Sequence, residues 1–314
     1  MNECFRRAGL RRALEMGHRT MPVSSAPVNI DVERNLAYRE AEDCDARLNL
    51  LDIYRCRVRG EGPRRPVALF VHGGDWSGGS KLAVHGREGG MAHWFAMRGW
   101  VFVSMNFRLV QNPLSPDADI PDQVDDIAKA IKWMSINIRR YGGDPSRITL
   151  VGFSSGAHLA ALLACDPVYL QRYRLTNSVI AQIICLDGAH FDVPLAIRML
   201  AEQSLGLAHQ DRRVRKLLRL MGEDEGRQRR LSPAGHPLAT LAGTRFLLLS
   251  AGMQGGGGQA FTKVMNERFS IQLKLAGVPV QHRHFAALGH KDLLLMRDED
   301  CRQCVDAFLV QGGD

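Results

Sequence analysis

The sequence has few of the features that mark disulfide-bonded, membrane-spanning or nucleic-acid-binding proteins. Its seven cysteines are odd in number and widely scattered, which argues against a disulfide framework and favours a reducing, cytoplasmic compartment. No apolar run approaches the roughly 20 residues needed to cross a bilayer, so we expect no membrane span. Aromatic residues make up only 7% of the chain, and none stands as a stacking platform beside the basic segment 212–230. Despite a net charge of +8, that segment is interleaved with acids and predicts a solvated helix face, with no nucleic-acid partner.

Signatures of bound metals and cofactors are missing as well. Cys301-x-x-Cys304 has no second cysteine pair, and no group of histidines and aspartates has metal-ligand spacing. The glycine run 255–258 is not followed by the Lys-Ser/Thr of a phosphate-binding loop. We therefore expect neither a metal nor a cofactor.

Apolar segments with the periods of strands and helices alternate along most of the chain. This order predicts an α/β fold with a mostly parallel sheet, helices on both faces, and the first two strands as an antiparallel edge. The expected strands are 29–39, 46–57, 67–71, 100–105, 148–151, 179–186, 245–250 and 280–285, and the expected helices are 82–98, 123–141, 157–164, 261–276 and 290–310.

Two stretches depart from this alternation. Residues 193–241 contain helical segments but no convincing strand, so we expect them to form a cap over one end of the sheet. Residues 1–28 begin with an arginine-rich stretch that lacks the apolar core of a secretory signal. Residues 1–20 are either an organelle-targeting helix or an extension before a second start at Met21. We expect residues 1–28 to lie outside the fold, leaving 29–314 as one domain with the cap inserted in it.

Two glycine-rich motifs follow expected strands and point to nucleophilic chemistry. Gly152-Phe153-Ser154-Ser155-Gly156 follows an apolar strand and precedes a helix of small residues, which is the setting of a nucleophile elbow with Ser154 as the nucleophile. His72-Gly73-Gly74-Asp75-Trp76 follows an earlier strand, where glycines let backbone N–H groups face a cavity. Gly73, Gly74 and Ser155 are therefore predicted to donate hydrogen bonds to an oxyanion.

A serine nucleophile also needs a base. His290 lies between the last expected strand and the final helix, the place of the base in the chain order serine, acid, histidine. His282 and His284 alternate with apolar residues inside that strand, so we expect them to be exposed strand residues. His158, one helical turn after Ser154, is expected to pack behind the elbow.

Together these motifs resemble the α/β-hydrolases of the esterase and lipase group, in particular its hormone-sensitive-lipase-like and kynurenine-formamidase-like branch. Further motifs of that branch are Asn106-Phe107-Arg108-Leu109 and Gly142-Gly143-Asp144-Pro145. The resemblance covers about residues 30–310 and implies an α/β-hydrolase fold with a helical cap after strand 6. It also implies Ser154 as the nucleophile, His290 as the base, and Gly73, Gly74 and Ser155 as oxyanion donors.

The chain departs from this family at the acid of the triad. Related enzymes usually carry it after the strand before last, and the corresponding segment here, 251–259, contains no carboxylate. Asp187, at the end of the strand 179–186, is one candidate, and Asp192 is a weaker one. The third alternative is that no acid exists and that Gln254, Gln259 or water orients His290.

Three functions follow from the resemblance. The first is a serine carboxylesterase that cleaves a small-molecule ester through an acyl-enzyme. The second is an arylformamidase, which the His-Gly-Gly-x-Trp motif favours and the long cap disfavours. The third is a hydrolase-fold binding protein with little catalysis, supported only by the absent carboxylate. A homodimer is compatible with all three.

Overall fold

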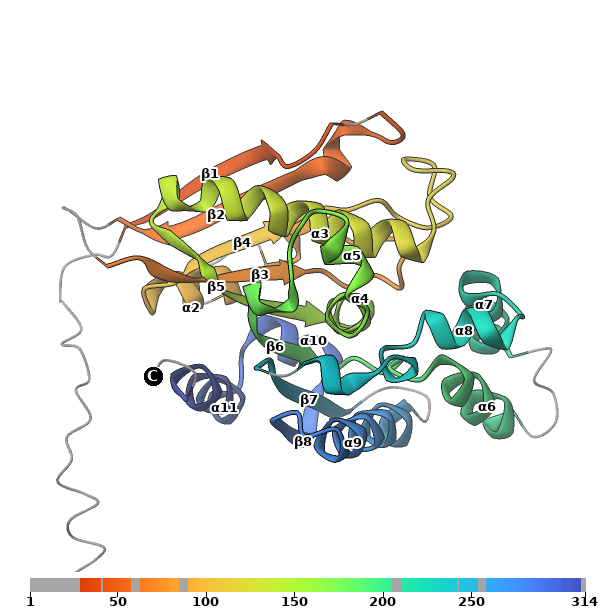
Figure 1. The fold of residues 1–314 in the computed structure, drawn as a ribbon. Coiled ribbons are helices and arrows are strands. Elements are labelled where there is room, and N and C mark those ends of the chain that lie inside the picture. Colours follow the sequence, from red (N-terminus) through yellow and green to blue (C-terminus); the bar gives the residue numbers. More distant parts are fainter. Residues whose placement is uncertain are drawn as a thin grey trace, which may run out of the picture.

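The computed structural model describes residues 29–40, 42–57, 63–84, 90–204, 211–241, 243–253 and 258–311. The expected extension 1–28 and Met21 lie outside these residues. In the part of the chain that is described, eight strands form one sheet in the order β1-β2-β4-β3-β5-β6-β7-β8 (Figure 1). The strands are β1 Ile30–Ala37, β2 Leu50–Cys56, β3 Arg65–Val71, β4 Val101–Met105, β5 Gly143–Phe153, β6 Ile180–Leu186, β7 Arg245–Met253 and β8 Val280–Gly289.

The sheet combines an antiparallel edge with a parallel centre. Strand β2 pairs antiparallel with both β1 and β4, and all later neighbours pair in parallel. The carboxyl ends of the parallel strands therefore meet at one edge, where loops can gather functional groups. These features confirm the predicted α/β-hydrolase architecture.

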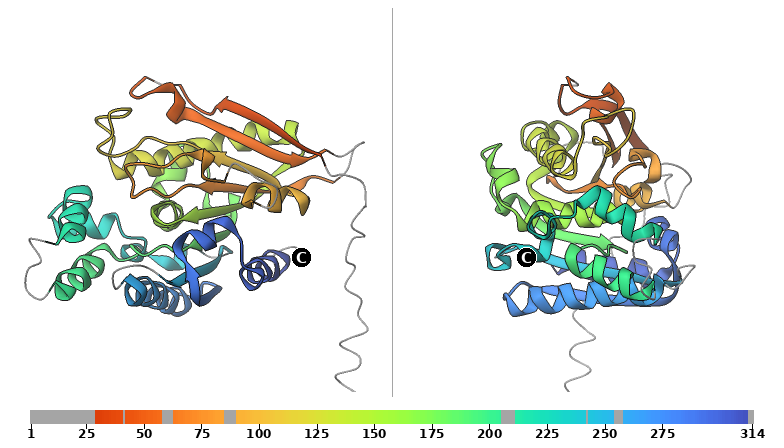
Figure 2. Two further views of the ribbon diagram at one scale, coloured as in Figure 1. Left: turned by 180° about the vertical axis from the view of Figure 1, so that it is seen from behind. Right: turned by 90° about the vertical axis from the view of Figure 1, so that its right-hand side faces the viewer.

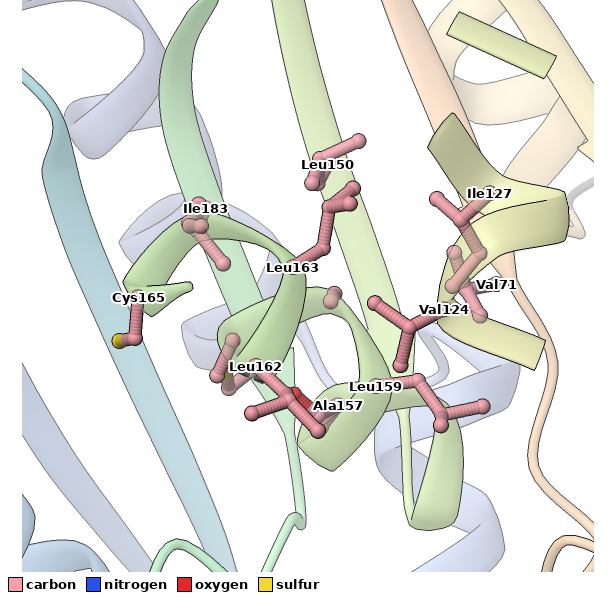
Figure 3. Packing of buried hydrophobic residues seen from close by; sticks show 14 of the residues in the cluster. Val71, Val124, Ile127, Leu150, Ala157, Leu159, Leu162, Leu163, Cys165 and Ile183 are labelled. Carbon is pink, nitrogen blue, oxygen red and sulfur yellow. Dashed lines mark hydrogen bonds between the residues drawn. The ribbon is translucent and has the colours of Figure 1, made fainter. Parts of the chain in front are cut away.

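Helices cover both faces of the sheet, as the continuous apolar strands predict. In β3, Val67, Leu69 and Val71 face a core shared with α3 and α4, whereas Ala68 and Phe70 face a second core shared with α2 and α11. Figure 3 shows Val124 of α3 beside Leu159 of α4, and Leu163 of α4 beside Leu150 of β5. The helices on the sheet are α2 Met91–Met97, α3 Ile120–Asn137, α4 Ser155–Cys165, α5 Val168–Gln171, α9 Gly258–Leu275, α10 His290–Leu295 and α11 Glu299–Val310.

The segment after β6 is helical and lies at one end of the molecule. It contains α6 Val193–Gln203, α7 Arg212–Met221 and α8 Glu225–Arg230. Figures 1 and 2 show these three helices together at the end opposite α11. Val214, Leu217, Leu220 and Met221 of α7 are buried, whereas most of its basic side chains are exposed. The structure thus has a helical insertion after strand 6, and its action as a cap remains a prediction.

Three sequence-based boundaries were wrong. The expected helix 82–98 is a 3-10 turn at Lys81–Val84 and a separate helix that begins at Met91. The expected strand 46–57 begins only at Leu50, because Asp45 caps a 3-10 turn over Ala46–Asn49. The expected helix 290–310 is two helices, because Met296 adopts a left-handed conformation with φ of 50° that ends α10.

Candidate active site

Ser154 stands on a strained turn between β5 and α4. Its backbone has φ of 54° and ψ of −121°, an uncommon conformation for a residue with a side chain. Its N–H donates a hydrogen bond of 2.8 Å to the carbonyl oxygen of Leu186, which fixes the turn to the end of β6. The flanking glycines are required, since a Cβ on Gly152 would lie 2.4 Å from the oxygen of Gly156, and one on Gly156 would lie 2.2 Å from the oxygen of Val71.

The loop after β3 lies directly against this turn. A Cβ on Gly73 would lie 2.9 Å from the Cβ of Ser154, so only glycine allows this approach. Gly74, Asp75 and Trp76 continue with positive φ angles of 130°, 53° and 61°. The N–H of Trp76 donates to Oγ of Ser155 over 3.3 Å, which joins the loop to the first residue of α4. The structure thus brings Gly73, Gly74 and Ser155 beside Ser154, while their role as oxyanion donors remains a prediction.

Trp76 is held in place by further hydrogen bonds. Its carbonyl oxygen accepts from Nε2 of Gln123 over 2.6 Å, and its indole N–H donates to Nδ1 of His158 over 3.1 Å. Because the indole can only donate, Nδ1 of His158 is unprotonated and Nε2–H donates to the oxygen of Leu231 over 2.7 Å. Burial lowers the pKa of His158 to about 4, so this ring is neutral near pH 7. His158 therefore lies behind the elbow as a supporting residue.

Asp187 and His290 meet at the carboxyl edge of the sheet. Oδ2 of Asp187 lies 2.5 Å from Nδ1 of His290, and Oδ1 accepts a hydrogen bond of 2.9 Å from the N–H of Ala251. The Asp187 side chain is fully buried, whereas that of His290 is 37% exposed. Because a carboxylate only accepts hydrogen bonds, Nδ1 carries the proton in this contact and Nε2 is left as the basic nitrogen. The ring of His290 also packs on Phe153, with 4.5 Å between ring centroids.

The other candidates for orienting His290 do not make this contact among the described residues. Oδ1 of Asp192 accepts a hydrogen bond of 3.0 Å from the N–H of Leu195, so this carboxylate caps the start of α6. Gln254 and the side chain of Gln259 lie outside the described part of the structure. His282 and His284 are half-buried, and both contact Oγ of Ser250, so the expectation that they are exposed was wrong. They lie beside Leu248 and Ser250 of the neighbouring strand β7, which the alternation within β8 alone did not reveal.

A cavity of about 490 Å³ opens beside these groups. Ser154, Ser155, Asp187 and His290 form its floor at the strand ends, and the helical insertion contributes Leu200, Arg213, Lys216 and Leu217. The remaining wall consists of Asp75, Trp76, Ala189, His190, Met253, Phe261 and Thr262. The cavity therefore combines apolar side chains with polar groups at its floor, at the insertion and in the remaining wall.

Charged side chains of this wall take part in two ion pairs. Nζ of Lys216 lies 2.5 Å from Oδ2 of Asp75, which connects α7 to the loop 72–76 after β3, the glycine loop. Nη2 of Arg213 lies 2.8 Å from Oδ2 of Asp211, at the start of the same helix. These pairs were not predicted, because the sequence does not show which residues of the insertion face the strand ends.

Arg108 is a further supporting residue that sequence reasoning did not assign. Its guanidinium makes two hydrogen bonds of 3.0 and 2.8 Å to the buried carboxylate of Asp126 in α3. Its carbonyl oxygen accepts from Nε2 of Gln123, the amide that also holds Trp76. The motif Asn106-Phe107-Arg108-Leu109 marked this position, but the buried acid on α3 could not be identified from spacing.

Within the described ranges, no group of three or more His, Cys, Asp or Glu side chains could hold a metal ion. No described helix combines the length and hydropathy needed to cross a membrane.

Comparison with protein families gives a match over part of the chain. Residues 51–179 match the BD-FAE family, a segment that includes the glycine loop and the elbow but not Asp187 or His290. Esterase LipQ of Mycobacterium tuberculosis is 40% identical over 119 residues, 38% of this chain and 26% of the relative. LipM of the same organism, named a probable carboxylic ester hydrolase, is 35% identical over 121 residues, with the same coverage of both chains. The alignments thus span about a quarter of these relatives.

Solved structures resemble nearly the whole chain. Esterase B from Lactobacillus rhamnosis superposes with a TM-score of 0.68 at 18% identity, covering 98% of this chain and 93% of that one. Esterase 2 of Thermogutta terrifontis gives a TM-score of 0.64 at 20% identity, covering 94% of this chain and 96% of that one. At these identities the likeness shows a shared fold, the α/β-hydrolase fold.

Proposed function

We propose that this α/β-hydrolase is a carboxylesterase that cleaves small-molecule esters through an acyl-enzyme on Ser154. The observation that carries the proposal is the 2.5 Å contact between the buried carboxylate of Asp187 and His290, beside a serine on a strained elbow. This contact supplies the carboxylate whose absence was the only argument for a binding protein with little catalysis. The partial matches to esterases LipQ and LipM support the same reaction class.

The proposed reaction follows from the groups in the cavity. Oγ of Ser154 attacks the ester carbonyl carbon while Nε2 of His290 accepts the hydroxyl proton, and Asp187 stabilises the resulting imidazolium. The N–H groups of Gly73, Gly74 and Ser155 bind the oxyanion. The imidazolium then gives its proton to the leaving alkoxide, which departs as the alcohol. Water, activated by the same ring, attacks the acyl-enzyme and releases the carboxylic acid and Ser154.

Covalent labelling tests the nucleophile independently of the natural substrate. A fluorophosphonate probe is expected to label the wild type, and mass spectrometry should locate the adduct on Ser154. Ser154→Ala should abolish labelling and hydrolysis of 4-nitrophenyl butyrate without changing the circular dichroism spectrum. Ser155→Ala is the matched control, because it keeps the backbone N–H and should retain the adduct. An adduct on Ser155, or labelling that persists in Ser154→Ala, would contradict the proposal.

The same preparation distinguishes an esterase from an arylformamidase. We expect a higher kcat/KM for 4-nitrophenyl butyrate than for N-formylkynurenine, because the cavity of about 490 Å³ extends beneath the helical insertion. The opposite order would favour the formamidase.

We also propose a reducing, cytoplasmic location. Six cysteines fall in the described part of the chain and all are free thiols, which supports this proposal.

A further inference from the structure

His190 occupies a distinctive position in the wall of the cavity. It lies between two aromatic rings, with 5.1 Å between its centroid and that of Trp76 and 5.7 Å to that of Phe261. Trp76 is fixed by Gln123 and His158, so the ring of His190 rests against a rigid neighbour. It lines the same cavity as Ser154 and His290, and a bound substrate would pass beside it.

The ring nitrogens of His190 have no hydrogen-bond partner among the residues that the structure describes. It makes ring contacts with Trp76 and Phe261, and nothing in the proposed reaction uses it. The side chain is partly buried and lines the substrate cavity, so its ring nitrogens are accessible to a bound molecule. A ring in this position offers hydrogen bonds to a polar group of the substrate.

The charge state of His190 restricts what can bind there. Burial lowers its pKa to about 3, with His158 and Lys216 acting in the same direction and Asp75 opposing them. The ring is therefore neutral near pH 7, with one nitrogen as a donor and the other as an acceptor. Neighbouring charges are already paired, Lys216 with Asp75 and Arg213 with Asp211. The position thus favours a neutral group over a carboxylate or a phosphate.

We propose that His190 is a specificity-determining residue that binds a hydroxyl group on the substrate, apart from the scissile ester. A hydroxyl group can both donate and accept, so either nitrogen of the ring can bind it. The inference rests on the proposed esterase function and narrows its substrates to esters with a hydroxyl on the acyl or the alcohol part.

Two pairs of esters separate the two possible sides of the substrate. For the acyl side, 4-nitrophenyl 3-hydroxybutyrate is compared with 4-nitrophenyl butyrate, and for the alcohol side, 2-hydroxyethyl butyrate is compared with ethyl butyrate. The variant is His190→Phe, which keeps an aromatic ring between Trp76 and Phe261 but removes both nitrogens. The control is His93→Phe on α2, a residue that does not line the cavity.

The measured quantity is the ratio of kcat/KM for the hydroxylated ester to that for the plain ester. We expect His190→Phe to lower this ratio about tenfold for one pair, since a neutral hydrogen bond contributes that much. A change in activity that is common to both esters of a pair cancels in this ratio, and His93→Phe should leave both ratios unchanged.

His190→Gln should recover part of the preference, because its amide can also donate and accept. Equal ratios in wild type and His190→Phe for both pairs would overturn the inference while leaving the esterase intact. So would an equal loss on hydroxylated and plain esters. No hydrolysis of any ester by the wild type would overturn the proposed function, and this inference with it.

Discussion

Hydrogen bonds of both its backbone and its side chain hold Asp187 in the position in which it contacts His290. Its backbone adopts φ of 50°, and its N–H donates a hydrogen bond of 2.7 Å to the oxygen of Leu249 in β7. Its two carboxylate oxygens have different partners, Ala251 on one side and His290 on the other. Asp187 is thus fixed to β7, the strand next to β6, and its carboxylate is held where it contacts His290.

Replacing Asp187 by Asn tests whether this contact has a catalytic role. The amide keeps the shape but can donate toward Nδ1, which would move the imidazole proton to Nε2 and leave no base for Ser154. We expect Asp187→Asn to lower kcat by about 10³–10⁴ with little change in KM. Steady-state hydrolysis of 4-nitrophenyl butyrate measures both constants.

Asp192→Asn is the matched control for that variant. Asp192 caps α6 through the N–H of Leu195, and asparagine caps helices about as well. Activity should therefore stay within about threefold of wild type. A loss of less than tenfold in Asp187→Asn would show that the contact with His290 is structural only.

At the scale of elements, the elbow and the glycine loop depend on each other. Gly73 approaches Phe153 and Ser154 so closely that a methyl group would meet the oxygen of Phe153 and the Cβ of Ser154, both at 2.9 Å. Relief requires a shift of the loop after β3 or of the turn after β5. Either shift moves the groups proposed to bind the oxyanion relative to the nucleophile.

Gly73→Ala is therefore expected to lower kcat by at least about 10², the loss that follows when one oxyanion donor is misplaced. The control is Gly78→Ala in the same loop, where the nearest atom to the new Cβ would be the oxygen of Gly74 at 3.6 Å. This ordinary contact should leave kcat within about threefold of wild type. Similar kcat values for the two variants would contradict the proposed position of the oxyanion donors.

The sequence predicted those strands and turns whose characteristic pattern lies within a few consecutive residues. Continuous apolar runs identified the buried strands. Small residues around Ser154 identified the elbow, because neighbouring backbone atoms lie too close to the turn for larger side chains. The break between α10 and α11 was missed because Met296 gives no sign of its left-handed backbone. Its side chain is buried in the core beside α11, so tertiary packing opposes the usual preference of methionine for a helix.

At the scale of the whole molecule, the partner of His290 could not be derived from sequence. Asp187 and His290 are 103 residues apart and meet only because β6, β7 and β8 are neighbours in the sheet. Sequence reasoning therefore left Asp187, Asp192 and the absence of an acid as alternatives. The same limit applied to His190, whose ring contacts Trp76 after β3 and Phe261 of α9.

We expect the buried, neutral histidines to make the folded protein less stable at acidic pH. Burial lowers the pKa of His72 and of His158 to about 4 and that of His190 to about 3, from 6.5 in an exposed histidine. Between about pH 4 and 6.5 the unfolded chain binds more protons than the folded one, so stability is lost as pH falls through this window. The raised pKa of Asp126 acts in the opposite direction, because its folded form holds a proton more readily.

We expect the free energy of unfolding, measured by urea denaturation at pH 7.5, 6.5, 5.5 and 4.5, to be constant above pH 6.5 and to decrease below it. Each of the three histidines contributes a slope of at most about 1.4 kcal/mol per pH unit. His158→Gln removes one titrating ring while keeping an acceptor for the indole N–H of Trp76, so its slope should be smaller by up to that amount. The comparison uses slopes because the substitution also changes stability at neutral pH. Unfolding free energies that do not fall between pH 6.5 and 4.5 would show that these rings are already protonated or hydrated in the folded protein.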